Sequence, residues 1–248
     1  MPMKFNYLSA EQLLEGHIMR PGPDTIDVCI AQWDALSFSP RELSVLPDAE
    51  QERGRALRQE TDRLAFFAGK ILLRRALSSY LNCAPEILSF KTGSHGKPYL
   101  FSPSGTISGF RPDIHFNLSH SGSYIAIAFS SAAPIGIDIE KVRKNLRAES
   151  LVRRFFHPDE YAQFQNMPED ARQEFIFRRW TVREAFLKGL GDGLSISPGS
   201  FLVSGLDNGF CIKKSQKDYS SWHISPIPAP DGYYCSIAYQ LDFQMPPV

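Results

Sequence analysis

Two acidic residues, Asp138 and Glu140, are separated by a single residue in the otherwise apolar segment 135–140 (IGIDIE). Because side chains alternate between the two faces of a strand, both carboxylates are expected to project from the same face. Two like charges side by side are costly to bury, and a bound divalent cation would offset their repulsion. Carboxylate oxygens suit a hard ion such as Mg²⁺, which typically also binds a substrate phosphate. The alternative is a strand end that exposes two acids to solvent.

A second group lies in the segment 178–190 (RRWTVREAFLKGL), for which the spacing predicts a helix. Trp180, Glu184 and Lys188 follow one another at four-residue intervals, which places an aromatic side chain, an acid and a base on one helix face. Glycines follow and predict the end of the helix. The alternative is an ordinary surface pair of Glu184 and Lys188, with the tryptophan in the core.

Two loops carry residues suited to binding a phosphate. His120 lies between two serines directly before a predicted strand, where its side chain can meet an anion. In the loop SHGKPYL, Gly96 allows a ligand to approach the backbone closely, and Lys97 offers a point charge. The alternatives are a locally hydrogen-bonded turn histidine and an ordinary charged turn.

The elements that must position these residues are both helical and extended. Residues 63–81 have apolar side chains at helical spacing over about five turns, and residues 149–191 are mostly helical. Apolar, β-rich segments flank these helices. The predicted strands are 28–33, 87–90, 114–118, 124–129, 135–139, 200–203, 210–213, 222–225 and 233–238. This mixture predicts an α+β fold.

A weak internal repeat is visible in the two long helical segments. Aligning residues 66–77 with 179–190 pairs Phe67 with Trp180 and Leu77 with Leu190. Amphipathic helices also resemble one another by chance, so the alignment leaves both a repeat and a coincidence open. If the repeat is structural, the chain consists of two α+β halves, and a cleft between them is the expected place for a site.

The bulk composition disfavours some classes of function. The 248 residues include 27 basic and 27 acidic side chains, so the net charge is zero, which argues against a general nucleic-acid binder. Four scattered cysteines without a CxxC pair predict free thiols in a reducing compartment. The N-terminus lacks the apolar core of a signal peptide, and no apolar run approaches the ~18 residues that span a bilayer. We therefore expect a cytoplasmic protein without a membrane partner.

Together, these motifs resemble the pattern of the Sfp-type 4′-phosphopantetheinyl transferases, in the same order and at similar spacing. That pattern is Gly-Lys-Pro, Asn-x-Ser-His-Ser, Gly-(Ile/Val)-Asp-x-Glu, and Trp-x-x-Lys-Glu with a lysine four residues after the glutamate. One departure is Arg183, where the family usually has lysine, and because a planar guanidinium differs in geometry from an ammonium, the role of Arg183 stays open. The matching residues are Gly96-Lys97-Pro98, Asn117-Leu118-Ser119-His120-Ser121, Gly136-Ile137-Asp138-Ile139-Glu140, Trp180-Thr181-Val182-Arg183-Glu184 and Lys188.

The resemblance implies an enzyme of the α+β 4′-phosphopantetheinyl transferase fold, with two similar α/β halves related by pseudo-twofold symmetry. It implies a Mg²⁺-dependent reaction, with Mn²⁺ as the alternative ion. The reaction would move the 4′-phosphopantetheine arm of coenzyme A to a serine of an apo acyl or peptidyl carrier protein and release 3′,5′-ADP. We expect residues 1–112 to contact the adenine and 3′-phosphate of coenzyme A, and residues 113–248 to contain the metal-binding and catalytic residues. The alternative is a non-catalytic relative that binds coenzyme A.

The resemblance also implies a role for each matching residue. The metal ligands would be Asp138, Glu140 and Glu184. Glu184 is also the candidate general base for the carrier serine. Lys188 would stabilise the departing 3′,5′-ADP, and His120 would contact a coenzyme A phosphate and complete the catalytic group. The other expected coenzyme A contacts are Lys97 and Pro98 at the adenine and ribose end, Ser119, and Arg53 at the 3′-phosphate.

The carrier proteins of this family's reactions are typically acidic helical bundles. The segment 151–179 mixes arginines with aromatic residues and is the expected docking surface for such a partner. The alternative places the aromatics in the core and the arginines in water. The chain length favours the form with both halves in one polypeptide, hence a monomer. The residues concerned are Arg153, Arg154, Phe155, Phe156, Phe164, Arg178 and Arg179.

Overall fold

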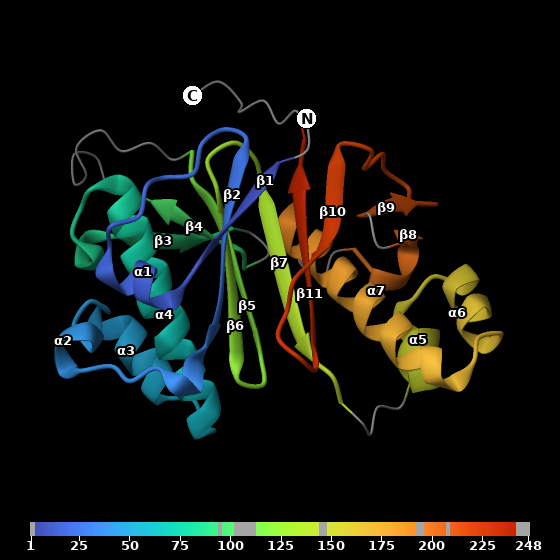
Figure 1. Ribbon diagram of the computed structural model, residues 1–248, viewed down its shortest axis with the longest axis horizontal. Coiled ribbons are helices and arrows are strands. Elements are labelled where there is room, and N and C mark those ends of the chain that lie inside the picture. The colour runs from blue at the N-terminus through green and yellow to red at the C-terminus, as the bar shows by residue number, and fades with distance from the viewer. Residues whose placement is uncertain are drawn as a thin grey trace. The chain divides into compact units, whose positions relative to one another are not determined.

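The chain forms two units, each built around one main sheet and one long helix (Figure 1). The computed structural model describes residues 3–93, 96–101, 113–143, 148–191, 196–206 and 209–241. We call residues 1–92 and 98–132 the N-terminal unit, and residues 93–97 and 133–248 the C-terminal unit.

The main sheet of the N-terminal unit has the strand order β1-β2-β6-β5. β1 runs parallel to β2, whereas β2, β6 and β5 are antiparallel neighbours. The strands of this unit are β1 (Lys4–Leu8), β2 (Thr25–Gln32), β5 (His115–Ser121), β6 (Tyr124–Ser130) and a separate pair, β3 (Ser89–Thr92) and β4 (Pro98–Phe101). Its α-helices are α1 (Ala10–Glu15), α2 (Pro40–Leu43), α3 (Asp48–Arg55) and α4 (Glu60–Leu81), and 3₁₀ helices span Trp33–Ala35 and Pro85–Ile87.

α4 buries its apolar face against the main sheet of this unit. Leu72 and Leu77 are fully buried in the same core as Ile127 of β6. A Cβ added at Gly69 would lie 3.0 Å from a methyl carbon of Leu118, so the missing side chain lets α4 pack close to β5. This contact places residues of α4 beside the β5 strand that carries the Ser-His-Ser motif.

The sheet of the C-terminal unit is antiparallel throughout, with the order β7-β11-β10-β9-β8. α7 packs on β7 and β11, and its side chains share a core with Trp222 and Ile224 of β10. The strands of this unit are β7 (Ile135–Lys141), β8 (Leu202–Leu206), β9 (Gly209–Lys213), β10 (Trp222–Ile227) and β11 (Tyr233–Gln240). Its helices are α5 (Ala148–Phe155), α6 (Pro158–Gln165), α7 (Glu169–Leu190) and a 3₁₀ helix at Pro198–Ser200.

The two units repeat the same order of elements. In the N-terminal unit, β2 is followed by shorter helices, α4, a 3₁₀ helix, β3, β4, β5 and β6. In the C-terminal unit, β7 is followed by shorter helices, α7, a 3₁₀ helix, β8, β9, β10 and β11. The strand pairing repeats too, because β2-β6-β5 and β7-β11-β10 are both antiparallel. The chain therefore contains an internal structural repeat.

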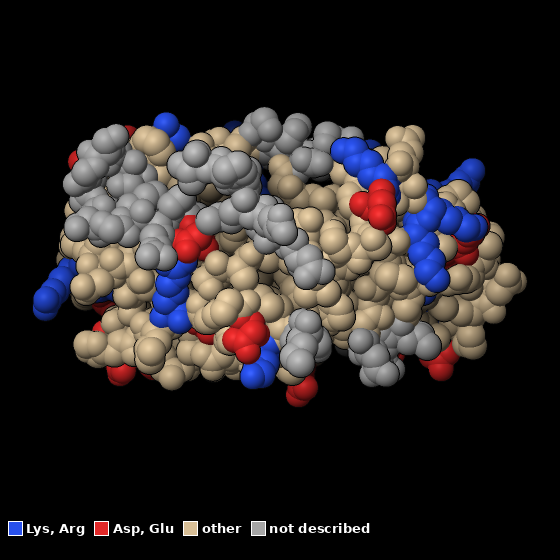
Figure 2. All heavy atoms as spheres, turned by 90° about the horizontal axis from the view of Figure 1, so that it is seen from above, with Lys and Arg blue, Asp and Glu red and all other residues tan. Residues whose placement is uncertain are grey.

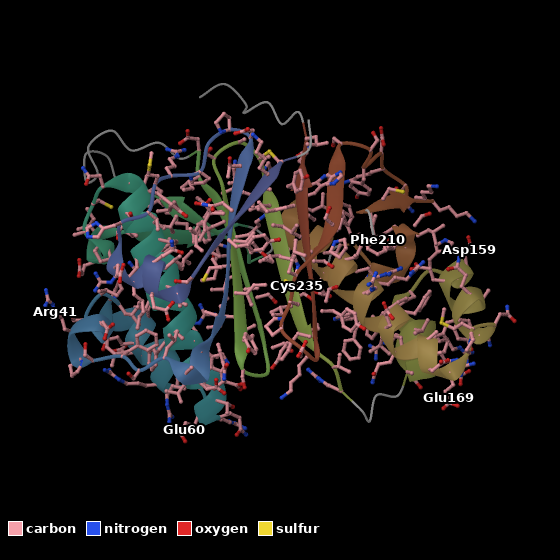
Figure 3. All side chains as sticks on the ribbon, viewed as in Figure 1. Arg41, Glu60, Asp159, Glu169, Phe210 and Cys235 are labelled. Atoms are coloured by element: carbon pink, nitrogen blue, oxygen red, sulfur yellow. The ribbon has the colours of Figure 1, made fainter. Side chains whose placement is uncertain are left out.

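The long helices give the register of this repeat. α4 and α7 are each 22 residues long, and they begin at Glu60 and Glu169 (Figure 3). An end-to-end alignment pairs Leu77 with Phe186, whereas the alignment made on sequence alone pairs it with Leu190. The difference is about one helical turn. Such a shift preserves the apolar spacing of an amphipathic helix, which is why the sequence pattern did not resolve it.

The predicted α+β class is confirmed, and most predicted strands lie within observed ones. The segments 87–90 and 200–203 differ, since 3₁₀ helices extend to Ile87 and to Ser200, and the strands β3 and β8 begin only at Ser89 and Leu202. The units also divide between Ala132 and Ala133, later than the expected division at 112/113. The physical reason is that β5 and β6 pair with β2 and thereby belong to the N-terminal unit.

Two further observations concern the surface charge and the helices. On the face shown in Figure 2, basic and acidic side chains of the described residues are interspersed. Within the ranges that the structure describes, no helix combines the length and apolar character needed to cross a membrane.

Candidate active site

β7 presents its two acids on one face. In the antiparallel register with β11, Asp138 pairs with Ser236 and Glu140 with Tyr234, so both carboxylates project from the same side of the strand. Asp138 is 3% exposed, and the side chain of Glu140 keeps 23% of its surface exposed. The strand thus holds one buried and one partly buried carboxylate toward α7.

Two glycines allow β7 and α7 to approach each other closely. A Cβ added at Gly136 would lie 2.8 Å from the Cα of Gly189, and closer still to the carbonyl oxygen of Ala185. A Cβ added at Gly189 would lie 2.5 Å from the indole ring of Trp222. Because neither position has room for a side chain, backbone contact sets the distance between the strand acids and the helix.

α7 presents Glu184 and Lys188 to the strand acids. The Nζ of Lys188 lies 2.6 Å from Oδ1 of Asp138. Burial raises the pKa of Glu184 above its usual value, the ammonium of Lys188 opposes this shift, and the carboxylate of Glu140 adds to it. The four side chains therefore interact as one charged cluster, which we call the β7–α7 cluster.

The three carboxylates of this cluster have the chemistry of a hard-cation site. Their oxygens suit Mg²⁺ or Mn²⁺, and the repulsion between Glu140 and Glu184 is the kind that a cation relieves. In the described part of the chain, however, no three His, Cys, Asp or Glu side chains are grouped closely enough to hold a metal ion. Asp138 instead binds the ammonium of Lys188, which supplies positive charge within the cluster.

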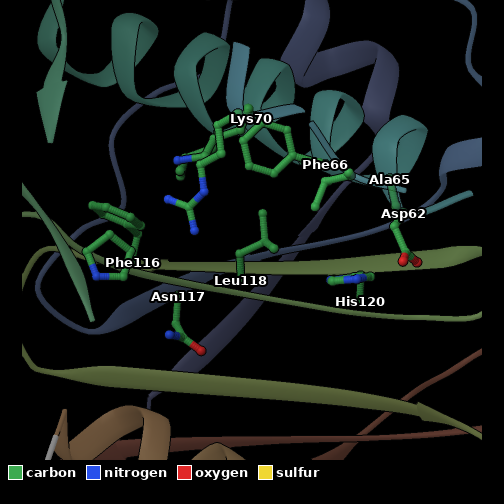
Figure 4. Close-up of a pocket in the computed structure, with 13 residues that line it drawn as sticks. Asp62, Ala65, Phe66, Lys70, Phe116, Asn117, Leu118 and His120 are labelled. Carbon is green, nitrogen blue, oxygen red and sulfur yellow. The ribbon is translucent and has the colours of Figure 1, made fainter. Parts of the chain in front are cut away.

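A pocket of about 410 Å³ lies within the N-terminal unit, between α3, α4 and the β5 strand (Figure 4). Three of the expected coenzyme A contacts line it, namely Arg53, Pro98 and His120. Arg53 and His120 are both exposed and thus accessible to a ligand. The structure therefore brings together three residues that lie far apart in the sequence.

Six α4 residues that sequence reasoning missed also line this pocket, and three of them, Asp62, Phe66 and Lys70, have charged or aromatic side chains. Figure 4 shows Phe66 and Lys70 facing the β5 side of the pocket, with Asp62 beside His120. The guanidinium carbon of Arg53 lies 5.9 Å from the centroid of the Phe66 ring. The sequence did contain a signal for these residues, because Asp62, Phe66 and Lys70 are spaced four apart and therefore share one helix face. The pocket combines cations with an aromatic wall, which suits a phosphorylated aromatic ligand.

Two expected coenzyme A contacts lie elsewhere. Lys97 donates hydrogen bonds to the carbonyl oxygens of Ile135, at 3.0 Å, and Gly189, at 2.7 Å. Burial lowers the pKa of Lys97 to about 8. Ser119 is 5% exposed and alternates with His120 along β5, and it is not among the described residues that line the pocket. The ammonium of Lys97 thus binds the end of α7, a contact that the sequence did not predict.

Arg183, whose role the sequence left open, points away from the β7–α7 cluster. Its side chain is fully buried and forms an ion pair with Glu160 of α6. Trp180, about one turn before Glu184, packs edge-on against Phe155 of α5 at 5.5 Å between ring centroids. The face that α7 turns to β7 therefore carries Glu184 and Lys188.

Part of the expected docking segment, residues 151–179, is buried in the core. Phe156 and Phe164 are each 3% exposed and belong to a core cluster, so the prediction that they form a surface is wrong for both. Arg153 and Arg154 of α5 are exposed, and Phe155 is partly buried. Packing explains the outcome, since Phe156 and Phe164 share a core with Val152 of α5, whereas the arginines of α5 face outward.

Comparisons with known proteins agree with this architecture. The family described as "4′-phosphopantetheinyl transferase superfamily" matches residues 134–238, and "4′-phosphopantetheinyl transferase, N-terminal" matches residues 32–132. A 4′-phosphopantetheinyl transferase of Bacillus subtilis is 33% identical over 78% of this chain and 75% of its own. The 4′-phosphopantetheinyl transferase Sfp of Bacillus subtilis strain 168 is 30% identical over 79% of this chain and 83% of its own.

Among solved structures, a holo-(acyl-carrier-protein) synthase from Bacillus anthracis, in complex with CoA (3′,5′-ADP), is 21% identical. It covers 44% of this chain and 97% of its own, with a TM-score of 0.36. On the family matches and the two Bacillus subtilis relatives, the chain belongs to the 4′-phosphopantetheinyl transferase family.

Proposed function

We propose that the protein transfers the 4′-phosphopantetheine arm of coenzyme A to a serine of an apo carrier protein and releases 3′,5′-ADP. The observation that carries the proposal is the β7–α7 cluster, where three carboxylates and one ammonium interact at a half-buried site. Attack by a serine hydroxyl on a phosphate needs a base for the proton and positive charge for the phosphate oxygens. The cluster contains candidates for both roles.

Glu184 is the proposed general base. In the metal-free protein burial raises its pKa, which makes the ionised carboxylate a better proton acceptor there than an ordinary glutamate. In the proposed step, the serine Oγ forms a bond to the β-phosphorus of coenzyme A and gives its proton to Glu184. The bond from that phosphorus to the oxygen of the leaving 3′,5′-ADP breaks, and Lys188 stabilises the negative charge that develops there.

Asp138, Glu140 and Glu184 are the proposed ligands of a divalent cation, Mg²⁺ with Mn²⁺ as the alternative. When bound, the ion would supply positive charge to the diphosphate oxygens of coenzyme A. Because Lys188 binds Asp138 at 2.6 Å, the proposal includes a rearrangement in which Lys188 releases this carboxylate. The partial exposure of Lys188, 30% of its side chain, allows such a movement.

The pocket of the N-terminal unit is the proposed subsite for the adenine and 3′-phosphate of coenzyme A. Arg53 and His120 would contact the phosphate, since both are basic groups on the pocket wall. Phe66 and Pro98 offer apolar surface to the base and ribose. Lys97 and Ser119 stay proposed contacts of the same ligand, although neither lines the pocket as described.

Acyl and peptidyl carrier proteins are the proposed partners. The exposed arginines of α5, Arg153 and Arg154, beside the partly buried Phe155, suit an acidic helical surface. Reversing both charges with Arg153→Glu and Arg154→Glu is expected to raise the KM for the carrier and leave the KM for coenzyme A unchanged. A carrier KM that does not change would remove α5 from the docking surface.

We further propose that the protein acts as a cytoplasmic monomer. Both repeated units belong to one chain, so a complete set of elements does not require a second copy. All four cysteines are free thiols, which accords with a reducing compartment.

The deciding experiment incubates the purified protein with fluorescent coenzyme A, Mg²⁺ and a panel of apo carrier proteins. Covalent labelling of at least one carrier is expected, and chelation of the divalent cation should abolish it. Asp138→Asn and Glu184→Gln should fold and lose labelling at least about 100-fold. Normal turnover in both variants would refute the site, and coenzyme A binding without labelling of any carrier would identify a non-catalytic relative.

A further inference from the structure

Arg183 is a fully buried cation that directly precedes the proposed base of α7. Its guanidinium forms an ion pair with Glu160 of α6, and both side chains have no exposed surface. The same guanidinium donates to the carbonyl oxygens of Arg179 and Pro198, each at 3.2 Å. Its carbon atom lies 4.3 Å from the centroid of the Phe156 ring. These contacts leave Arg183 in one orientation, turned into the protein.

Glu160 is held from several sides. The Nε of Arg179 lies 3.1 Å from its Oε1, and Arg183 binds its Oε2. The backbone amide nitrogen of Val203, on β8, lies 3.4 Å from the same Oε2. Arg179 and Arg183 are about one turn apart on α7, so a single carboxylate of α6 forms ion pairs with two successive turns of that helix. Because a buried charge that loses its partner is strongly unfavourable, this arrangement resists distortion.

Helix geometry connects these contacts to the proposed active site. Successive residues of an α-helix point about 100° apart, so Arg183 and Glu184 project to different sides of α7. Arg183 faces α6 and β8, whereas Glu184 interacts with Glu140 and Lys188 on the β7 side. α7 is therefore held on one side by buried charges and on the other by backbone contact with β7.

We propose that Glu160, Arg179 and Arg183, which we call the Glu160 brace, position Glu184 and Lys188 against the acids of β7. Arg183 is then a positioning residue that does not touch the substrate. The inference rests on the proposed function, because it assigns to the brace the alignment of that catalytic cluster. It also accounts for a basic residue directly before the glutamate, since only a cation can complete the brace.

The N-terminal unit contains an equivalent arrangement. Glu50 of α3 lies 3.1 Å from Nζ of Lys70 and 2.8 Å from Nε of Arg74. Lys70 and Arg74 occupy the positions in α4 that the two brace arginines occupy in α7 when the helices are aligned end to end. Arg74 donates to the carbonyl oxygen of Pro85, and both Pro85 and Pro198 begin the 3₁₀ helix that follows the long helix. The repeat therefore supplies a matched control, because α4 carries no residue of the β7–α7 cluster.

The test compares Arg183→Met and Arg183→Lys with Arg74→Met and Arg74→Lys. For each variant we would measure Tm, kcat for carrier labelling, and the Kd of Mn²⁺ by electron paramagnetic resonance in the presence of coenzyme A. All four substitutions are expected to lower Tm. Arg183→Met should also raise the Mn²⁺ Kd about 10-fold and lower kcat about 100-fold, as expected when catalytic groups move by about 1 Å. Arg183→Lys should recover part of the lost Mn²⁺ affinity and part of the lost kcat, because an ammonium can still bind Glu160.

Because α4 lines the proposed coenzyme A subsite, the comparison is made at saturating coenzyme A. Under that condition the Arg74 variants should keep the Mn²⁺ Kd and kcat within about twofold of the wild type, since α4 carries no residue of the β7–α7 cluster. If the Arg183 variants behave like the Arg74 variants, with a lower Tm and nothing else, the positioning role is overturned. Should Arg183→Met fail to fold, Arg183→Lys decides by the same criteria. A wild-type protein that labels no carrier would refute the proposed function, while its Mn²⁺ Kd would still test the brace.

Discussion

Replacing Gly136 by alanine should disable the proposed site without changing the identity of any charged residue of the β7–α7 cluster. The new Cβ would lie 2.8 Å from the Cα of Gly189, and ordinary contact begins at 3.4 Å, so β7 and α7 must separate by at least about 0.6 Å. The carbonyl oxygen of Ala185 lies closer still, which makes a larger separation necessary. Misplacing catalytic groups by about 1 Å costs about 100-fold in rate. Overpacking alone lowers the free energy of unfolding by about 1–3 kcal/mol.

The assay is the initial rate of carrier labelling with fluorescent coenzyme A at saturating Mg²⁺, together with Tm from calorimetry. Gly136→Ala is expected to lower kcat about 100-fold in a protein that remains folded at the assay temperature. The control is Gly22→Ala, because a Cβ at Gly22 meets its nearest atom, Oδ1 of Asp24, at an ordinary 3.5 Å. A Gly136→Ala protein with wild-type kcat would show that the close approach of β7 and α7 does not position the site.

Three further predictions address individual charges. Glu140→Gln removes a negative charge that raises the pKa of Glu184. The fall of kcat on the acid side of its pH profile should therefore move to lower pH. An unchanged profile would mean that Glu184 is not the titrating base. His120→Ala should weaken coenzyme A binding about 10-fold in calorimetry, as expected for loss of one hydrogen bond to a charged group, with partial activity retained. Unchanged affinity would exclude the phosphate contact. For Lys97, burial lowers the pKa from 10.5 to about 8. The buried ammonium therefore destabilises the folded state fully below pH 8, and this destabilisation disappears as the pH rises toward 10.5. The free energy of unfolding of the wild type, relative to Lys97→Met, should therefore increase across this range, and curves that stay parallel would contradict the burial of the ammonium.

Periodicity accounts for the parts of the fold and the site that could be predicted. The two-residue period of a strand was sufficient to place Asp138 and Glu140 on one face, and the four-residue spacing of a helix did the same for Glu184 and Lys188. The same rules identified both long helices and the strands of the two main sheets except β1, which was not predicted. Periodicity failed on the alignment of the repeat, because amphipathic helices look alike after a shift of one turn.

The residues that the sequence misjudged are those whose role depends on a partner distant in the chain. Asp62, Phe66 and Lys70 become pocket residues only because α4 packs against β5. Phe156 and Phe164 have the same residue type as a docking aromatic, and only packing decides that they are internal.

The sequence by itself determined the family, the acids of β7 and the acid and base of α7, because these depend on residue type and on spacing within single elements. The tertiary structure alone decided where the long cationic side chains end. Lys97 reaches the carbonyl oxygens of Ile135 and Gly189, and Arg183 reaches Glu160 across a helix interface. A flexible side chain several bonds long can bind any acceptor within its reach, and only the packing of distant segments determines which acceptor lies there.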